Sequence, residues 1–275
     1  MKKTVTSFLK DKKEGKKIAM LTCYDYSTAK LMDAAGIDIV LVGDSVGQVV
    51  LGYDDTISVT VEDMIHHSAA VSRGYKNGFL LVDMPFMSYQ VSVEEAMRNA
   101  GRIMKEGHAN GVKLEGGERT CPQIRAITEA GIPVCAHLGL TPQSVHAVGG
   151  YKVNGRTEEQ AEQLLREAKM VEEAGAFMLV LECVPRELAE LISKELTIPT
   201  IGIGAGAGTD GQVLVYQDML GMFDDFVPKF VKHFSNVGEV MTNAFREYKT
   251  EVENMAFPEE KHGYTIDEEV LNRLY

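Results

Sequence analysis

The sequence predicts an α/β protein that folds as a closed (β/α)8 TIM barrel, and two observations lead to this prediction. Short apolar runs alternate with helical segments about eight times over about 250 residues, as expected for repeated strand–helix units. Four of these runs end in an acidic residue, namely Asp44, Asp83, Glu115 and Glu182. In a closed barrel all carboxyl ends share one rim, whereas the runner-up, an open doubly wound sheet, spreads them across its width. The four acids therefore favour the barrel.

The expected strands are apolar runs without polar alternation, the pattern of parallel strands that are buried on both faces. Seven such runs lie at residues 18–22, 39–45, 79–83, 111–115, 133–136, 177–182 and 199–203. An eighth strand is expected at residues 226–230, where Pro228 interrupts the run.

The expected helices begin at capping residues and end at glycines. Asp25 caps a helix that Gly36 ends, and another helix runs over residues 60–74. In a capping box, a hydroxyl and the side chain three residues later each accept a backbone N–H. Three further helices are expected to start with such boxes at Ser92, Thr120 and Thr157. Gly131 and Gly175 end the last two of these, and Pro185 starts the helix that follows.

One domain is expected over residues 1–275. The lysine-rich segment 1–17 has Phe8 and Leu9 as its apolar anchors, so it predicts a short surface helix that covers one end of the fold. Residues 240–275 predict a charged C-terminal extension, helical at first and then loose.

The composition indicates a soluble cytoplasmic protein. A net charge of −12 argues against nucleic acid or an anionic membrane as a partner, because both select clustered Lys and Arg. No apolar run approaches the roughly 20 residues of a membrane span, and the N-terminus has no apolar signal-peptide core. Reduced thiols are expected, since no C-x-x-C pair occurs among Cys23, Cys121, Cys135 and Cys183.

The four acids at the strand ends predict a functional site. A buried, unpaired charge costs several kcal/mol, so converging carboxylates require a metal, another cation or a shared proton. Oxygen ligands from separate strands suit Mg²⁺. The alternative, that each acid caps the helix after its strand, predicts no convergence of the four.

Three polar residues lie beside these acids, and each has a structural alternative. Lys113 shares a strand face with Glu115, so it either forms a structural ion pair or binds an anionic substrate group. Ser45 either turns the chain or donates to a substrate carboxylate. His137, at the expected tip of the fifth strand, is either structural or contacts substrate or water.

Other features of the sequence are not expected to take part in the chemistry. His66 and His67 are adjacent on a helix and are expected to be surface or packing residues. Residues 206–211 match G-x-G-x-x-G, but the motif lies late in the chain, so close backbone approach to a ligand is favoured over a dinucleotide site. Cys183 points away from the rim and is not expected to be a nucleophile. The long polar stretch 138–156 starts at the rim and predicts a lid.

Seven motifs in order resemble the ketopantoate hydroxymethyltransferase family of the phosphoenolpyruvate mutase/isocitrate lyase superfamily. They are VGDSVG (42–47), DMPF (83–86), VKLEGG (112–117), HLGLTPQ (137–143), GGYKV (149–153), LECVP (181–185) and IGIGAG (201–206). None is decisive alone, whereas the ordered set is specific, covers most of the chain and shows no departure at the acidic positions.

The resemblance implies a Mg²⁺-dependent transfer of a hydroxymethyl group from 5,10-methylenetetrahydrofolate to 3-methyl-2-oxobutanoate, giving 2-dehydropantoate on the route to pantothenate and coenzyme A. It also implies an enolate that the metal stabilises and a homodecamer of two stacked pentamers. The alternatives are a superfamily relative that cleaves or rearranges a C–C or P–C bond, and an inactive barrel that serves as a scaffold.

The resemblance also implies roles for individual residues. Asp44 and Asp83 would bind Mg²⁺, with Glu115 completing the shell, and the chelated oxo acid would lie against both aspartates. Ser45 and Lys113 would hold the substrate carboxylate, His137 would contact the substrate, and Glu182 would accept the C3 proton.

Overall fold

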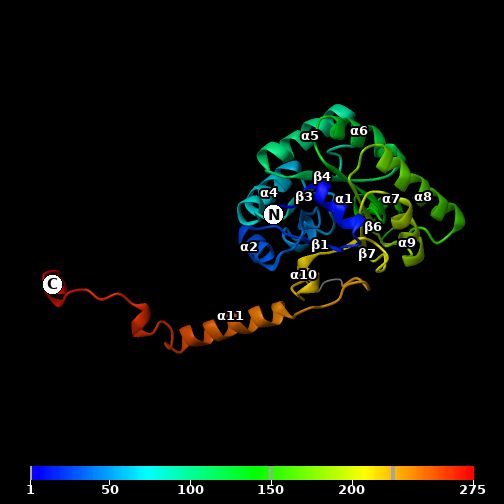
Figure 1. Ribbon diagram of the computed structural model, residues 1–275. Helices are drawn as coiled ribbons and strands as arrows, with labels where there is room; N and C mark the ends of the chain where they lie inside the picture. Colours follow the sequence, from blue (N-terminus) through cyan, green and yellow to red (C-terminus); the bar gives the residue numbers. More distant parts are fainter. Residues whose placement is uncertain (1, 149, 151, 224–226) are drawn as a thin grey trace.

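The computed structural model describes residues 2–148, 150, 152–223 and 227–275, and it confirms the closed (β/α)8 barrel. Eight parallel strands close in sequence order, so that the last strand pairs with the first. The strands are β1 (Ile18–Thr22), β2 (Ile39–Val42), β3 (Phe79–Asp83), β4 (Gly111–Glu115), β5 (Val134–Gly139), β6 (Met178–Glu182), β7 (Thr200–Ile203) and β8 (Gly211–Leu214). Figure 1 shows the helices arranged around these strands.

The apolar runs form strands because both of their faces are buried. Alternate residues such as Val40, Leu80 and Leu114 belong to the larger apolar cluster, which includes side chains of the surrounding helices. Their neighbours, such as Ile39 and Leu81, belong to a second cluster in the barrel interior. Burial on two sides leaves no room for polar alternation, which explains the uniform runs.

The N-terminal helix α1 (Val5–Lys13) closes the barrel at the end opposite the acids, as predicted for segment 1–17. Its Phe8 is fully buried, and the Phe8 ring lies 5.7 Å from the ring of Phe79, which in turn lies 5.4 Å from Phe177. These three rings belong to the interior cluster. The floor of the barrel is therefore aromatic and buried.

Most helices begin and end close to the predicted residues. The longer ones beside the barrel are α2 (Tyr26–Ala35), α4 (Val61–Gly74), α5 (Val93–Glu106), α6 (Cys121–Glu129), α8 (Glu158–Glu173) and α9 (Arg186–Glu195). Short helices lie in the loops: α3 (Val46–Val49), η1 (Glu118–Thr120), η2 (Pro142–Ser144), α7 (Val145–Val148) and α10 (Tyr216–Met219). Asp25 caps α2, and Gly36 ends it with a φ of 74°.

The predicted capping boxes are only half right. Ser92 and Thr157 accept the expected backbone N–H, but Glu95 accepts from Asn99 and Gln160 accepts from backbone N–H groups before Thr157. At Thr120 the prediction is wrong. Because the turn η1 already precedes α6, the Thr120 hydroxyl donates back to two carbonyl oxygens instead of capping.

The predicted eighth strand is also wrong. Residues 227–230 form no strand, and residue 226 lies outside the described residues. The true β8 follows β7 after a glycine-rich loop over residues 204–210, with no helix between them. Gly211 begins β8, where a Cβ would lie only 2.4 Å from the carbonyl oxygen of Ile18, so this glycine allows close strand approach. Gly206 and Gly208 lie against α9, and a strand rather than a helix follows the motif, unlike in a dinucleotide site. The expected approach of this loop to a ligand stays a prediction.

The C-terminal segment projects from the barrel as α11 (Val237–Glu253), followed by η3 (Glu260–His262) and α12 (Glu268–Leu271) (Figure 1). No residue of α11 is buried, although Phe245 and Tyr248 are among its exposed side chains. Near the start of this segment, a hollow of about 740 Å³ lies along β1 and β8 and reaches Met219 and Phe234. Among the described residues, no helix has the length and apolar character needed to cross a membrane.

Candidate active site

The strand ends gather the predicted acids at one rim of the barrel. Asp83, Glu115 and Glu182 are the last residues of β3, β4 and β6. Asp44 lies two residues beyond β2, in the turn before α3. The observed strand therefore ends earlier than the predicted range 39–45. The Asp44 backbone N–H donates to Asp83 Oδ2 at 3.1 Å, and this contact brings the two acids together.

His137 lies inside β5 rather than at its tip, because this strand extends through Gly139. The parallel register pairs His137 with Glu115 on β4 and with Val180 on β6. Its ring is 2% exposed, and therefore lies within the barrel below the rim. The predicted strand end at residue 136 was three residues short.

Lys113 and His137 are the basic groups in contact with these acids. Lys113 Nζ lies 3.0 Å from Asp83 Oδ1 and 3.2 Å from His137 Nδ1. The two ring nitrogens of His137 lie between carboxylates, with Nδ1 3.5 Å from Glu115 Oε1 and Nε2 3.3 Å from Glu182 Oε2. The structure thus joins five of the predicted residues in one chain of charges.

Burial and charge shift the pKa values of these groups in opposite directions. Burial, together with the charges of Asp83 and Glu115, raises the pKa of Asp44 well above its usual value. Burial also opposes ionisation of Glu115, but His137 and Lys113 outweigh it and lower the Glu115 pKa. Burial raises the pKa of Asp83 too, against the opposing charge of Lys113. Among the described residues, Asp83 forms an ion pair with Lys113, whereas Asp44 forms none.

The two basic groups are held in their charged forms. Burial by itself would lower the pKa of Lys113, but the carboxylates of Asp83, Glu115 and Asp44 raise it. For His137, burial and Lys113 lower the pKa, while Glu115 and Glu182 raise it more strongly, to about 9. The two flanking carboxylates therefore favour the charged form of the ring, whereas Lys113, 3.2 Å from Nδ1, opposes it.

Ser45 and Tyr24 form a hydroxyl pair beside the acids. The Ser45 hydroxyl lies 2.7 Å from the Tyr24 hydroxyl, and it makes no capping contact with the short helix that follows it. Tyr24 is buried, and Asp44 and Asp83 are among the groups that raise its pKa. The Ser45 hydroxyl is therefore held beside the acids by Tyr24 rather than by its own backbone.

Gln143 and Tyr89 also belong to the site, and the sequence interpretation missed them. The Gln143 side-chain nitrogen donates to Asp44 Oδ2 at 2.8 Å, and its backbone N–H donates to Glu115 Oε2 at 3.1 Å. The Tyr89 hydroxyl donates to Gln143 Oε1 at 2.7 Å. Gln143 ends the motif HLGLTPQ, but no strand or helix period indicated that its side chain crosses to the acid after β2.

The donor set suits a hard divalent cation. Three buried carboxylates, those of Asp44, Asp83 and Glu115, meet one buried ammonium group, that of Lys113, which lies 3.0 Å from Asp83 Oδ1. In the described part of the chain, no three His, Cys, Asp or Glu side chains already stand at metal-binding spacing. The oxygen ligands and the surplus negative charge nevertheless fit Mg²⁺ by their chemistry.

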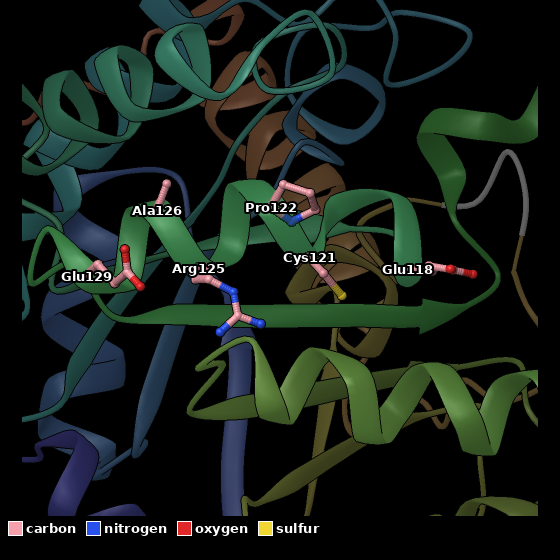
Figure 2. A pocket seen from close by; sticks show the side chains of 6 residues that line it. All are labelled: Glu118, Cys121, Pro122, Arg125, Ala126 and Glu129. Carbon is pink, nitrogen blue, oxygen red and sulfur yellow. The ribbon is translucent and has the colours of Figure 1, made fainter.

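The histidines and the cysteine that were not expected to be catalytic do not belong to the network of acids and bases described above. His67 packs at 5.3 Å from the ring of His66, and its Nδ1 contacts the Tyr24 carbonyl oxygen. Cys183 follows Glu182 with a positive φ of 50°, and burial raises its pKa to about 11, which does not suit a nucleophile. A separate hollow of about 430 Å³ along α6 contains none of the rim residues (Figure 2).

The predicted lid segment starts at the site. After β5 the chain forms η2 and α7, and His146 Nε2 lies 3.2 Å from Asp55 Oδ2 on the loop after β2. The Asn154 side chain donates to the carbonyl oxygen of Gly139. Residues 149 and 151 lie outside the described residues, and the lid stays a prediction.

Comparison with known proteins shows the family. The model of the family described as ketopantoate hydroxymethyltransferase matches residues 2–260. The chain belongs to this family. It is 62% identical over 275 residues to the 3-methyl-2-oxobutanoate hydroxymethyltransferase of Clostridium novyi and 60% identical to that of Enterococcus faecalis, with 100% of each chain covered. The chain is therefore an enzyme, as the seven motifs predicted.

Solved structures of the phosphoenolpyruvate mutase/isocitrate lyase superfamily share the fold. A phosphonopyruvate hydrolase superposes with a TM-score of 0.62 at 12% identity, covering 99% of this chain and 94% of its own. A 2,3-dimethylmalate lyase of that superfamily gives 0.59 at 16% identity, covering 99% and 91%. At these identities the comparison concerns the barrel alone.

Proposed function

We propose that the chain catalyses Mg²⁺-dependent hydroxymethyl transfer from 5,10-methylenetetrahydrofolate to 3-methyl-2-oxobutanoate, giving 2-dehydropantoate. The observation that carries the proposal is the set of three buried carboxylates around Lys113, with a fourth, Glu182, on the far side of His137. The curated relatives with the same length and more than half of their residues identical bear the name of this activity.

The four acids would have two different roles, three as metal ligands and one as a base. Asp44 and Asp83 would hold Mg²⁺, with Glu115 completing the shell. When bound, Mg²⁺ supplies Lewis-acid stabilisation of the negative charge that develops on the keto oxygen of the substrate. The raised pKa of Asp44 supports this assignment, because a carboxylate that lacks a cation is stabilised by one.

Lys113 and Ser45 would bind the substrate carboxylate. The Lys113 ammonium is held charged and buried, where its attraction for an anion is stronger than in water. The Ser45 hydroxyl adds a donor whose orientation is limited by Tyr24. Together they would fix the oxo acid so that its C3 faces β6.

Glu182 would accept the C3 proton. It is the least enclosed of the four acids, with a side chain 16% exposed, and it contacts no other acid in the network described above. His137 Nε2 lies 3.3 Å from Glu182 Oε2, so the ring would border the base on the side away from Glu115. After proton removal, C3 of the enolate would form a bond to the methylene carbon of the folate. The bonds from that carbon to the two folate nitrogens would break, water would supply the hydroxyl group, and tetrahydrofolate would leave.

Product formation from the two proposed substrates, measured with and without Mg²⁺, tests the proposal. We expect 2-dehydropantoate only when both substrates and the metal are present. Release of a smaller acid without folate would instead indicate a lyase or mutase of the same superfamily. Absence of any metal-dependent turnover would indicate a scaffold.

We further propose a cytoplasmic homo-oligomer, with the decamer as the expected form. The exposed apolar side chains of α11 and the hollow along β1 and β8 support association, because large apolar surfaces on a soluble chain are commonly covered by a partner. The cysteines are all free, as expected in a reducing compartment. Light scattering after gel filtration should give ten times the mass of the chain, and a monomer would contradict this.

A further inference from the structure

The Gln143 side chain has every polar group occupied. Its nitrogen donates to Asp44 Oδ2 at 2.8 Å and to the carbonyl oxygen of Met84 at 3.0 Å. Its oxygen accepts from the Tyr89 hydroxyl at 2.7 Å and from the Gln90 side chain at 3.3 Å. The residue is 3% exposed, so these partners replace water completely.

The partners fix which way the amide points. The Met84 carbonyl oxygen can only accept, so the nitrogen must lie on that side, which is also the side of Asp44. The Tyr89 hydroxyl has one hydrogen and two acceptors within reach, Gln143 Oε1 at 2.7 Å and the Glu115 carbonyl oxygen at 3.2 Å, and the shorter contact favours donation to Gln143. The same hydroxyl oxygen accepts the Glu115 backbone N–H at 3.2 Å. A flipped amide would lose these contacts and place its oxygen against a carboxylate.

Gln143 therefore contacts two of the proposed cation ligands by two different groups. Its side chain holds one oxygen of Asp44, and its backbone N–H holds one oxygen of Glu115. Each carboxylate keeps its second oxygen for another partner. Because the amide is neutral, it can orient Asp44 without neutralising the charge that attracts a cation.

We propose that Gln143 is a positioning residue for the divalent-cation site, and that it presents Asp44 and Glu115 to the ion while Tyr89 fixes its orientation. The inference rests on the proposed function, since it assumes that these carboxylates bind Mg²⁺. It also gives the segment after β5 a role, because Gln143 lies in η2 at the start of that segment. Groups that orient metal ligands typically change metal affinity by about 10–100-fold when removed.

The test is metal affinity measured without substrates. Calorimetric titration of the whole protein with Mn²⁺ or Mg²⁺ alone should give a Kd that is about 10–100-fold higher for Gln143→Leu than for the unmodified chain. The Mg²⁺ concentration for half-maximal activity should rise by the same factor, while kcat at saturating Mg²⁺ changes far less. A residue that merely supports the fold would not divide its effects in this way.

Gln123→Leu is the matched control. Gln123 makes the same kind of contact nearby, donating to the Tyr89 carbonyl oxygen at 3.3 Å, but it has no contact with the carboxylates. Its metal affinity should equal that of the unmodified chain. Equal loss in both variants would mean that any glutamine near Tyr89 matters, and would overturn the inference.

Tyr89→Phe decides the matter if Gln143→Leu does not fold. Loss of one hydroxyl frees the amide, so the Kd for Mn²⁺ should rise several-fold; an unchanged Kd overturns the inference. Failure of the proposed function would give a different result. The unmodified chain would then bind neither Mn²⁺ nor Mg²⁺, or it would form no 2-dehydropantoate. Normal metal binding in both the unmodified chain and Gln143→Leu would overturn only the role of Gln143.

Discussion

Asp44 and Asp83 differ in their surroundings, although both are acids beside the same rim. Asp83 pairs with the buried Lys113 at 3.0 Å, whereas Asp44 faces two other acids and one neutral amide. Removing Asp83 leaves the buried Lys113 without its nearest carboxylate. Removing Asp44 relieves repulsion between like charges.

We expect Asp44→Ala and Asp83→Ala both to abolish Mg²⁺-dependent turnover, with opposite effects on stability. Without metal, Asp83→Ala should lower the free energy of unfolding by about 3–5 kcal/mol, as for other broken buried pairs. Asp44→Ala should leave it unchanged or raise it. Denaturant unfolding measures both, and an Asp44→Ala variant that keeps its normal Mg²⁺ requirement would contradict the metal assignment.

The charge of His137 gives the protein a pH dependence. Because its folded pKa is raised from 6.5 to about 9, the charged ring stabilises the fold fully below about pH 6.5. This stabilisation is lost as the pH rises through 9. We expect His137→Gln to lower the melting temperature at pH 6 more than at pH 10, and an equal loss at both values would show that the ring is neutral.

The residue contacts were only partly predictable from the sequence. The acids and Lys113 could be found because they interrupt or end apolar runs. Gln143 could not, since its contacts depend on the chain folding back across the rim after β5. Residues that follow a strand have no periodicity that assigns them a direction.

Among the elements, the strands were predictable where both faces are buried. The run from Phe79 to Asp83 is buried at every position and gave the right bounds. In β8 the pattern fails, because Gln212 is exposed and Gly211 carries no side chain. The capping boxes failed for a related reason, since nearby groups such as Asn99 compete for the same side-chain oxygens.

The segment after β5 is the element with the clearest predicted role. We expect deletion of residues 148–154 to lower kcat, because water would then reach the enolate. The melting temperature should change little, since the barrel strands are untouched. Steady-state kinetics with both substrates measures the effect, and unchanged kcat and substrate affinity would rule out the lid.

For the molecule as a whole, the barrel and the C-terminal extension contribute unequally to stability. None of the side chains of α11 is buried within the chain. We expect removal of residues 240–275 to leave the circular dichroism of the barrel intact while reducing the mass of the assembly. An unchanged assembly would place the association surface elsewhere, and loss of all secondary structure would show that the barrel depends on the extension.

For the whole molecule, we propose that one rim of the barrel enolises an oxo acid by using a cation and a separate base. The proposed cation ligands lie at or just beyond the ends of β2, β3 and β4, and the proposed base lies across the barrel at the end of β6. This division requires a closed barrel, because an open sheet would separate these strand ends.

Exchange of the C3 hydrogen of 3-methyl-2-oxobutanoate with deuterated water, followed by NMR without folate, tests this claim most directly. The unmodified chain should catalyse exchange only with Mg²⁺. Glu182→Gln should bind Mg²⁺ and the oxo acid normally but exchange about 10²–10⁴-fold more slowly. Exchange at the unmodified rate in Glu182→Gln would contradict the account by placing the base elsewhere, and loss of Mg²⁺ binding would make Glu182 a ligand instead.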